Sequence, residues 1–125
     1  MSVDQDCSPE LTAMLGAAIA TSISDIPFDG PISTTQVGLV DGEFVFNPTA
    51  AQKEVSDLAL TVASTKEKVI MIEAGANEVP EAQMIEAIFA AHELNQKVIA
   101  FIETIVAECG KAKHEYTSCA VPEEL

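Results

Sequence analysis

Histidines and carboxylates are the side chains of this chain most able to do chemistry, yet their spacing matches no common catalytic motif. His92-Glu93 lacks the second histidine of a zinc-binding HExxH helix. His92 also falls on an apolar helical stripe, which favours a core position over a catalytic or metal-binding role. His114 falls in the tail, where we expect it to be solvated. Four aspartates at the ends of elements are expected to serve turns and caps: Asp25, Asp29, Asp41 and Asp57.

Cysteine and glycine patterns exclude several further classes of site. Cys7, Cys109 and Cys119 are widely spaced, odd in number and form no CxxC pair, so we expect reduced thiols and neither a disulfide framework nor a zinc site. The sequence contains no P-loop and no GxGxxG motif. Gly38 and Gly42 fall in a predicted hairpin and not in the strand-to-helix turn that cradles phosphates.

Charge is the most unusual bulk property of the chain. Twenty Asp and Glu face six Lys and no Arg, for a formal net charge of −14. Domains that grip phosphate backbones carry a basic patch, in which Arg is the preferred residue. We therefore expect that these residues do not hold RNA by themselves.

The length and hydropathy of the chain predict one soluble domain. The 125 residues suffice for a single core, and an apolar share of 48% argues against disorder. No apolar run reaches the roughly 18 residues that a membrane span needs, and no basic start precedes a short apolar stretch. We expect no membrane partner and a cytoplasmic location.

The first half of the chain reads as a helix followed by a hairpin. Ser8-Pro9-Glu10 is a helix start, and Pro27 is expected to end that helix. Its predicted inward stripe is Leu11, Leu15, Ala18, Ile19, Ser22 and Ile26. Residues 33–40 and 43–46 read as strands joined by Asp41-Gly42, the strongest short hairpin signal. Thr49 is expected to cap a short helix that runs through Val55.

The second half reads as another strand pair and a long helix. Residues 58–63 and 69–72 are predicted strands whose apolar runs suggest cover on both faces, and residues 74–79 are a predicted turn. Pro80-Glu81 opens a helix that Gly110 is expected to end. The predicted buried stripe of this helix is Ile85, Ile88, His92, Ile99, Ile102, Ile105 and Cys109. The fold class is therefore α+β, with helices packed on a mainly antiparallel sheet.

Four stretches in order along the chain carry a family resemblance. They are Leu15–Ile32, Val37–Thr49, Gln83-Met84 and Ala91–Glu93. Together they resemble the first RNase PH-like repeat of bacterial polynucleotide phosphorylases, over roughly residues 3 to 116. The element order derived above is that of the second half of such a repeat, so the resemblance implies an RNase PH-like fold.

The resemblance also implies an activity for the parent protein. Enzymes of this family degrade RNA from the 3′ end with inorganic phosphate as the attacking group, release nucleoside diphosphates and need a divalent metal, magnesium. It implies a homotrimer in which RNA is bound through the parent protein. The partner of these residues would be the rest of the parent chain, above all its second RNase PH-like repeat.

The catalytic parts of the family do not carry over to this chain. In the second repeat, two acids six residues apart and a lysine two further on serve metal and catalysis, and a serine run at a helix start holds phosphate. Laid on this chain without gaps, the acid and lysine positions fall at Lys53, Ala59 and Thr61, and the helix start offers only Ser8 before Pro9. The resemblance thus implies no catalytic, cofactor-binding or metal-binding residue here, and no bound cofactor.

Both ends of the chain read as cut. Met1-Ser2-Val3 resembles the end of a strand, and residues 121–125 begin a helix that stops within its first turn. We expect residues 1–113 to be the C-terminal part of the first RNase PH-like domain, and residues 114–125 to start a linker to a helical domain. Two functions remain: a non-catalytic scaffold and oligomerisation half of the enzyme, or an independent acidic interaction domain of the same fold with no RNA role.

Overall fold

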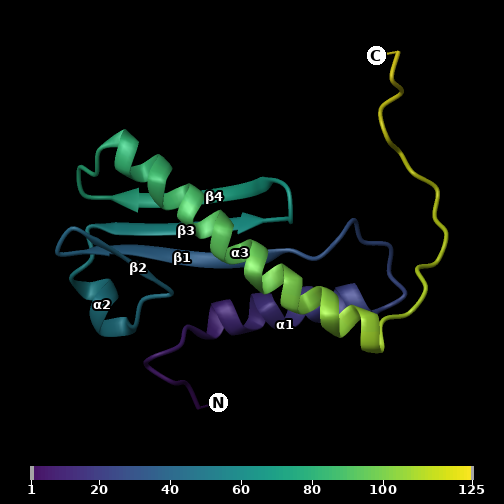
Figure 1. Ribbon diagram of the computed structural model, residues 1–125, viewed down its shortest axis with the longest axis horizontal. Coiled ribbons are helices and arrows are strands. Elements are labelled where there is room, and N and C mark those ends of the chain that lie inside the picture. Colours follow the sequence, from purple (N-terminus) through teal and green to yellow (C-terminus); the bar gives the residue numbers. More distant parts are fainter. Residues whose placement is uncertain (1, 125) are drawn as a thin grey trace.

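A computed structural model describes residues 2–124 and shows three helices on and around one sheet (Figure 1). The elements, in chain order, are α1 (Pro9–Ile23), β1 (Ser33–Val40), β2 (Glu43–Phe46), α2 (Ala50–Glu54), β3 (Leu58–Ser64), β4 (Val69–Ala76) and α3 (Glu81–Cys109). The strands form a four-stranded sheet in the order β2-β1-β3-β4, and every neighbouring pair is antiparallel. The α+β class and the antiparallel sheet are confirmed.

Three local sequence signals are found in the structure at their predicted positions. Asp41 and Gly42 both have positive φ, 51° and 80°, as the tight turn between β1 and β2 requires. The Thr49 hydroxyl accepts from the Gln52 N–H, and the Gln52 side chain accepts from the Thr49 N–H, which completes a capping box at α2. Pro9 stands at the start of α1, where its missing N–H costs no intrahelical bond.

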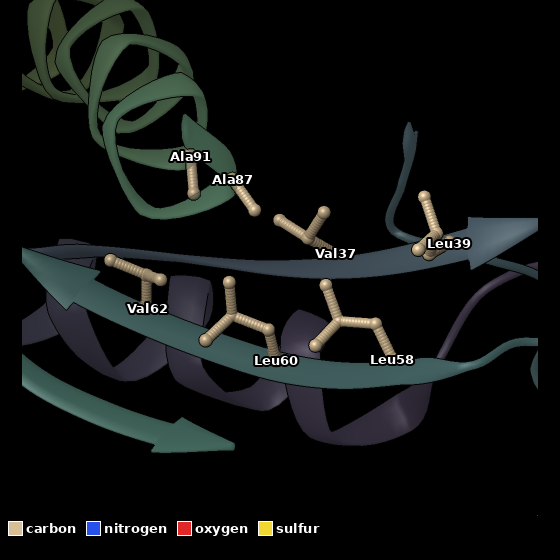
Figure 2. Packing of buried hydrophobic residues seen from close by; sticks show 7 residues of the cluster. All are labelled: Val37, Leu39, Leu58, Leu60, Val62, Ala87 and Ala91. Carbon is tan, nitrogen blue, oxygen red and sulfur yellow. The ribbon is translucent and has the colours of Figure 1, made fainter. Parts of the chain in front are cut away.

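The core lies between α3 and the middle of the sheet. Alternate residues of β1 and β3 point at α3, among them Val37, Leu60 and Val62 (Figure 2). Ala87 and Ala91 of α3 face them, and both are completely buried because their short side chains let the helix approach the sheet closely. Each fully buried Val or Leu contributes about 1.5–3 kcal/mol relative to an exposed one.

A buried amide ties α3 to two strands. The Asn95 amide nitrogen donates to the Val62 carbonyl at 3.1 Å and to the Ser64 hydroxyl at 2.9 Å. The Thr35 hydroxyl donates to the Asn95 amide oxygen at 2.7 Å. Because a polar side chain of zero exposure is tolerated only when it is hydrogen-bonded, this network selects one register of α3 on the sheet.

The chain after α3 folds back on the C-terminal end of α1. The Lys113 ammonium donates to the carbonyls of Thr21, Ser22 and Ser24, at 3.0, 3.0 and 2.6 Å. The backbone N–H groups of Lys111 and His114 donate to carbonyls of the same helix end and the loop beyond it. Carbonyls that a helix end leaves without intrahelical donors are thereby satisfied by a distant part of the chain.

Several predicted boundaries and faces are wrong. The first helix ends at Ile23 and not near Pro27, so Ile26 lies beyond it and is exposed. The predicted α3 stripe is confirmed at Ile99 and Ile102, which are fully buried, but Ile85 and Cys109 are exposed. The first half of the buried face consists of Ala87, Ala91 and Asn95. Alanines occupy the part of this face that packs on Val37, Leu60 and Val62, because their short side chains allow a close approach to the sheet.

The fourth strand differs most from its prediction. It runs to Ala76, so the predicted turn over residues 74–79 is mostly strand. It is not covered on both faces, because every residue from Ile70 to Ala76 is exposed. The reason is its place in the sheet: β4 is an edge strand, and α3 packs chiefly on β1 and β3.

Candidate functional site

The face of the sheet opposite α3 carries a cavity of about 520 Å³. Its floor includes Gln36, Thr61 and Glu73, which are cross-strand neighbours on β1, β3 and β4. The opposite side chains of these strands face α3, so the cavity lies on the other side of the sheet. Its wall comes from the α2 segment and the residues around it, including Lys53.

Pro48 and Ser56, which flank α2, bring that wall against β1. The Ser56 hydroxyl accepts from the Leu39 N–H at 2.8 Å and donates to the Leu58 carbonyl at 2.7 Å, so it joins β1 to the start of β3. Gly38 makes the close approach possible, because a Cβ there would lie 3.0 Å from the Ser56 hydroxyl oxygen. The sequence analysis did not predict that Gly38 or Ser56 would shape a site.

The cavity gathers the three positions at which the resemblance places the family's acids and lysine. Lys53, Ala59 and Thr61 all line it, although they come from α2 and β3. Ala59 supplies no carboxylate, Thr61 no amine, and Lys53 puts a cation where the family pattern has an acid. These positions therefore offer no pair of carboxylates that could share a divalent cation.

The start of α1 lies beside this cavity. A smaller hollow of about 140 Å³ is lined by Ser8, Pro9, Glu10 and Lys53, so the helix start and the α2 wall adjoin. The Ser8 hydroxyl donates to the Glu10 carboxylate. This bond, with smaller contributions from the Glu10 backbone and the Lys53 ammonium, lowers the pKa of the Glu10 carboxyl. The serine at this helix start is thus hydrogen-bonded to an acid, and the Glu10 carboxylate puts a negative charge at the start of α1.

Gln36, in the floor of the cavity, has a buried polar atom without a partner in the described residues. The side-chain oxygen of Gln36 is buried and has no hydrogen-bond partner within residues 2–124. Sequence reasoning missed Gln36, because a glutamine inside a β-strand carries no local signal of a pocket. The only guide to it would have been its register opposite Thr61.

The other side chains considered from the sequence lie apart from this cavity. His92 is half-buried on α3, with its Nε2 atom 3.3 Å from the Gln96 amide nitrogen, and its Nδ1 atom is buried without a partner in the described part of the chain. Asp41 occupies the β1–β2 turn, as predicted. The three cysteines are free and exposed. Within residues 2–124 no group of three or more His, Cys, Asp or Glu side chains could hold a metal ion.

None of the helices in residues 2–124 combines the length and the apolar character that crossing a membrane requires. The described residues contain one ion pair, between Lys66 and Glu103 at 3.3 Å, and both partners are exposed. The acidic surface is therefore largely unpaired, and an exposed pair of this kind contributes little stability.

Solved structures and curated proteins resemble this chain at two levels. The crystal structure of rice (Oryza sativa) Rrp46 superimposes with a TM-score of 0.72 at 16% identity, covering 84% of this chain and 51% of that one, which establishes the fold. The polyribonucleotide nucleotidyltransferase of Lachnoclostridium phytofermentans is 79% identical over the whole chain, and that of Alkaliphilus oremlandii 56%. The chain spans 18% of the length of each of these two relatives.

The family assignment comes from the middle of the chain. Domain 2 of the 3′ exoribonuclease family matches residues 30–93, which run from the loop before β1 into α3 and include the whole sheet. This match covers just over half of the residues and contains the three cavity positions discussed above. The chain belongs to the 3′ exoribonuclease family.

Proposed function

We propose that the chain is a non-catalytic, structural part of a polynucleotide phosphorylase. In this proposal residues 1–113 are the C-terminal part of its first RNase PH-like domain, and residues 114–125 start the linker to a helical domain. The observation that carries the proposal is the composition of the cavity. Its Lys53, Ala59 and Thr61 stand where the family's second repeat has two acids and a lysine.

The parent protein would act as a 3′-to-5′ phosphorolytic exoribonuclease in mRNA degradation. Inorganic phosphate attacks the terminal phosphodiester, a nucleoside diphosphate leaves, and the shortened RNA keeps the displaced 3′ oxygen. Magnesium would stabilise the charge that develops at phosphorus, at carboxylates of the second repeat. We propose a cytoplasmic homotrimer in which this half buttresses the active repeat.

The charge of the chain supports a structural role. A net charge of −14 with no Arg offers no basic surface along which a phosphate backbone could lie. Aromatic residues make up only 5% of the chain, so bases have few side chains to stack on. RNA would therefore be held by other parts of the parent protein.

A phosphorolysis assay tests the proposal. The purified chain is incubated with end-labelled RNA, phosphate and magnesium, and nucleoside diphosphates are measured. We expect no release and no polymerisation of nucleoside diphosphates, whereas the full-length enzyme performs both reactions. The control is a mock preparation from the same host, which reports contaminating enzyme. Phosphate-dependent release above that control would overturn the proposal, and Asp57, Asp41 and Ser8 would be the first residues to substitute.

A further inference from the structure

One side of the molecule exposes apolar side chains next to an unpaired strand edge. Ile72 of β4 pairs with Val62, so it lies on the sheet face that α3 covers, yet it is 50% exposed. Ala74 and Ala76 follow on the same face and are exposed too. The helix leaves them open because it packs chiefly on β1 and β3.

The neighbouring side of α3 is apolar as well. Gln96 donates to the Lys66 carbonyl and Glu103 pairs with the Lys66 ammonium, which places this stripe of the helix toward the β3–β4 turn. Ile85 and Phe89 precede Gln96 by eleven and seven residues and stand on the same stripe. They are 53% and 62% exposed. We call Ile72, Ala74, Ala76, Ile85 and Phe89 the β4–α3 surface.

The edge of β4 has little of the usual protection against pairing. Its register shifts once, by a bulge at Ile70 near the start of the strand, and the pairing with β3 is regular from Met71 to Ala76. Along its eight residues the strand carries one charged side chain, Glu73, and neither lysine nor proline. Within residues 2–124 no strand pairs with its outer edge. Natural sheets shield such edges with lysine, proline, bulges or a covering element. An open, apolar edge of this length is therefore suited to accept another strand.

The charge around this surface indicates what kind of polypeptide would fit. Four glutamates lie between the end of β4 and the middle of α3, and no lysine or arginine falls among them: Glu78, Glu81, Glu86 and Glu93. The nearest lysines before β4, Lys66 and Lys68, lie at the β3–β4 turn. An apolar surface with an acidic rim is complemented by a partner with apolar side chains and a basic rim. A second copy of the chain would bring the same acids face to face, which disfavours self-pairing.

The relatives are much longer than this chain, so we look for such a partner within the same polypeptide. This chain spans 18% of the length of its curated relatives, and its match accounts for 51% of the Rrp46 chain. We propose that the β4–α3 surface docks a basic segment of the longer chain, which adds a strand to β4 and covers Ile72, Ile85 and Phe89. The inference rests on the proposed function only in that the chain acts within a longer polypeptide.

Amide hydrogen exchange tests this docking. The probe is the Lachnoclostridium phytofermentans enzyme with its matching 125 residues replaced by this chain, compared with the 125-residue chain alone. We expect β4 amides to exchange at least about tenfold more slowly in the full-length protein, because strand addition hydrogen-bonds an edge that otherwise opens freely. Equal β4 exchange in both proteins would overturn the proposal. Concentration-dependent protection of β4 in the short chain would also overturn it, in favour of a second copy.

Substitutions within the full-length protein give a second measurement that does not need the short chain to fold. Ile72→Lys should restore fast exchange to β4, since a lysine on the docking surface must be desolvated there. Val55→Lys is the control, because Val55 is 65% exposed and lies beyond α2, away from the β4–α3 surface. Equal exchange of β4 in the two variants would count against docking. The phosphorolysis assay on the short chain is unaffected by either result, so the two proposals fail separately.

Discussion

Three residues of one cavity occupy the positions at which the family resemblance places two acids and a lysine. Lys53, Ala59 and Thr61 converge from α2 and β3 on the same hollow. The fold therefore brings positions 53, 59 and 61 to one cavity, and none of the three side chains is a carboxylate. Placing aspartates at positions 53 and 59 tests whether the cavity holds two carboxylates close enough to bind one ion.

We predict that the double variant Lys53→Asp, Ala59→Asp gains a divalent-cation site. Two carboxylates in one pocket bind a hard cation weakly, with an expected dissociation constant of roughly 10⁻⁴ to 10⁻³ M. Isothermal titration with Mn²⁺ measures it. The matched control, Lys53→Asp with Ala13→Asp, has the same charge but puts the second acid on α1, outside the cavity. Identical Mn²⁺ binding by both variants would show that positions 53 and 59 do not cooperate.

The elements are held together by contacts between distant parts of the chain as well as by the core. The C-terminal end of α1 is the clearest case, because Lys113 donates to three of the carbonyls there. A cation at this position also complements the negative end of the helix dipole. The long helix and the tail thus fix where α1 lies.

We predict that Lys113→Met lowers the free energy of unfolding by about 1 kcal/mol, since charge-assisted bonds at a partly solvated site are worth no more. Methionine keeps the apolar stem and removes only the ammonium group. Thermal unfolding followed by circular dichroism measures the loss as a few degrees in Tm. Lys111→Met is the control, because Lys111 contacts α1 through its backbone N–H, which methionine retains. A Tm drop of the same size in both variants would contradict the capping role.

At the scale of the whole molecule, the excess of acidic residues is the main electrostatic feature. Fourteen net negative charges on a 13.2 kDa chain repel one another and destabilise the compact state. RNA-binding domains carry a basic surface, which this excess of acids disfavours. The same excess gives the β4–α3 surface its acidic rim.

We predict that Tm rises with salt, because the Debye length falls from about 30 Å at ~0.01 M to about 3 Å at ~1 M. The gain in stability is on the order of 1 kcal/mol, which corresponds to several degrees in a domain of this size. Scanning calorimetry across this range measures it. In the triple variant Glu78→Gln, Glu86→Gln, Glu93→Gln the salt dependence should be smaller. A Tm that does not change with salt would show that the acids are too far apart to interact.

The sequence by itself determined the local features of this protein. The Asp41-Gly42 turn, the Thr49 cap and the Pro9 helix start could all be predicted, because each depends on a few neighbouring residues and on backbone dihedrals they favour. The bounds of β1 and β2 followed from that turn. The three cavity positions followed from the family resemblance, which also implied that their side chains could not hold a metal.

Only the tertiary structure decided which surfaces are covered. The burial of Asn95 and the lysine cap on α1 depend on contacts between residues more than thirty positions apart. The exposure of β4 depends on α3, which packs chiefly on β1 and β3. An apolar run such as residues 69–72 has the same pattern in a central strand and in an edge strand, so hydropathy could not show that a helix would miss it. Burial is a property of the assembled sheet and its neighbours, and within residues 2–124 it leaves the long edge strand β4 exposed.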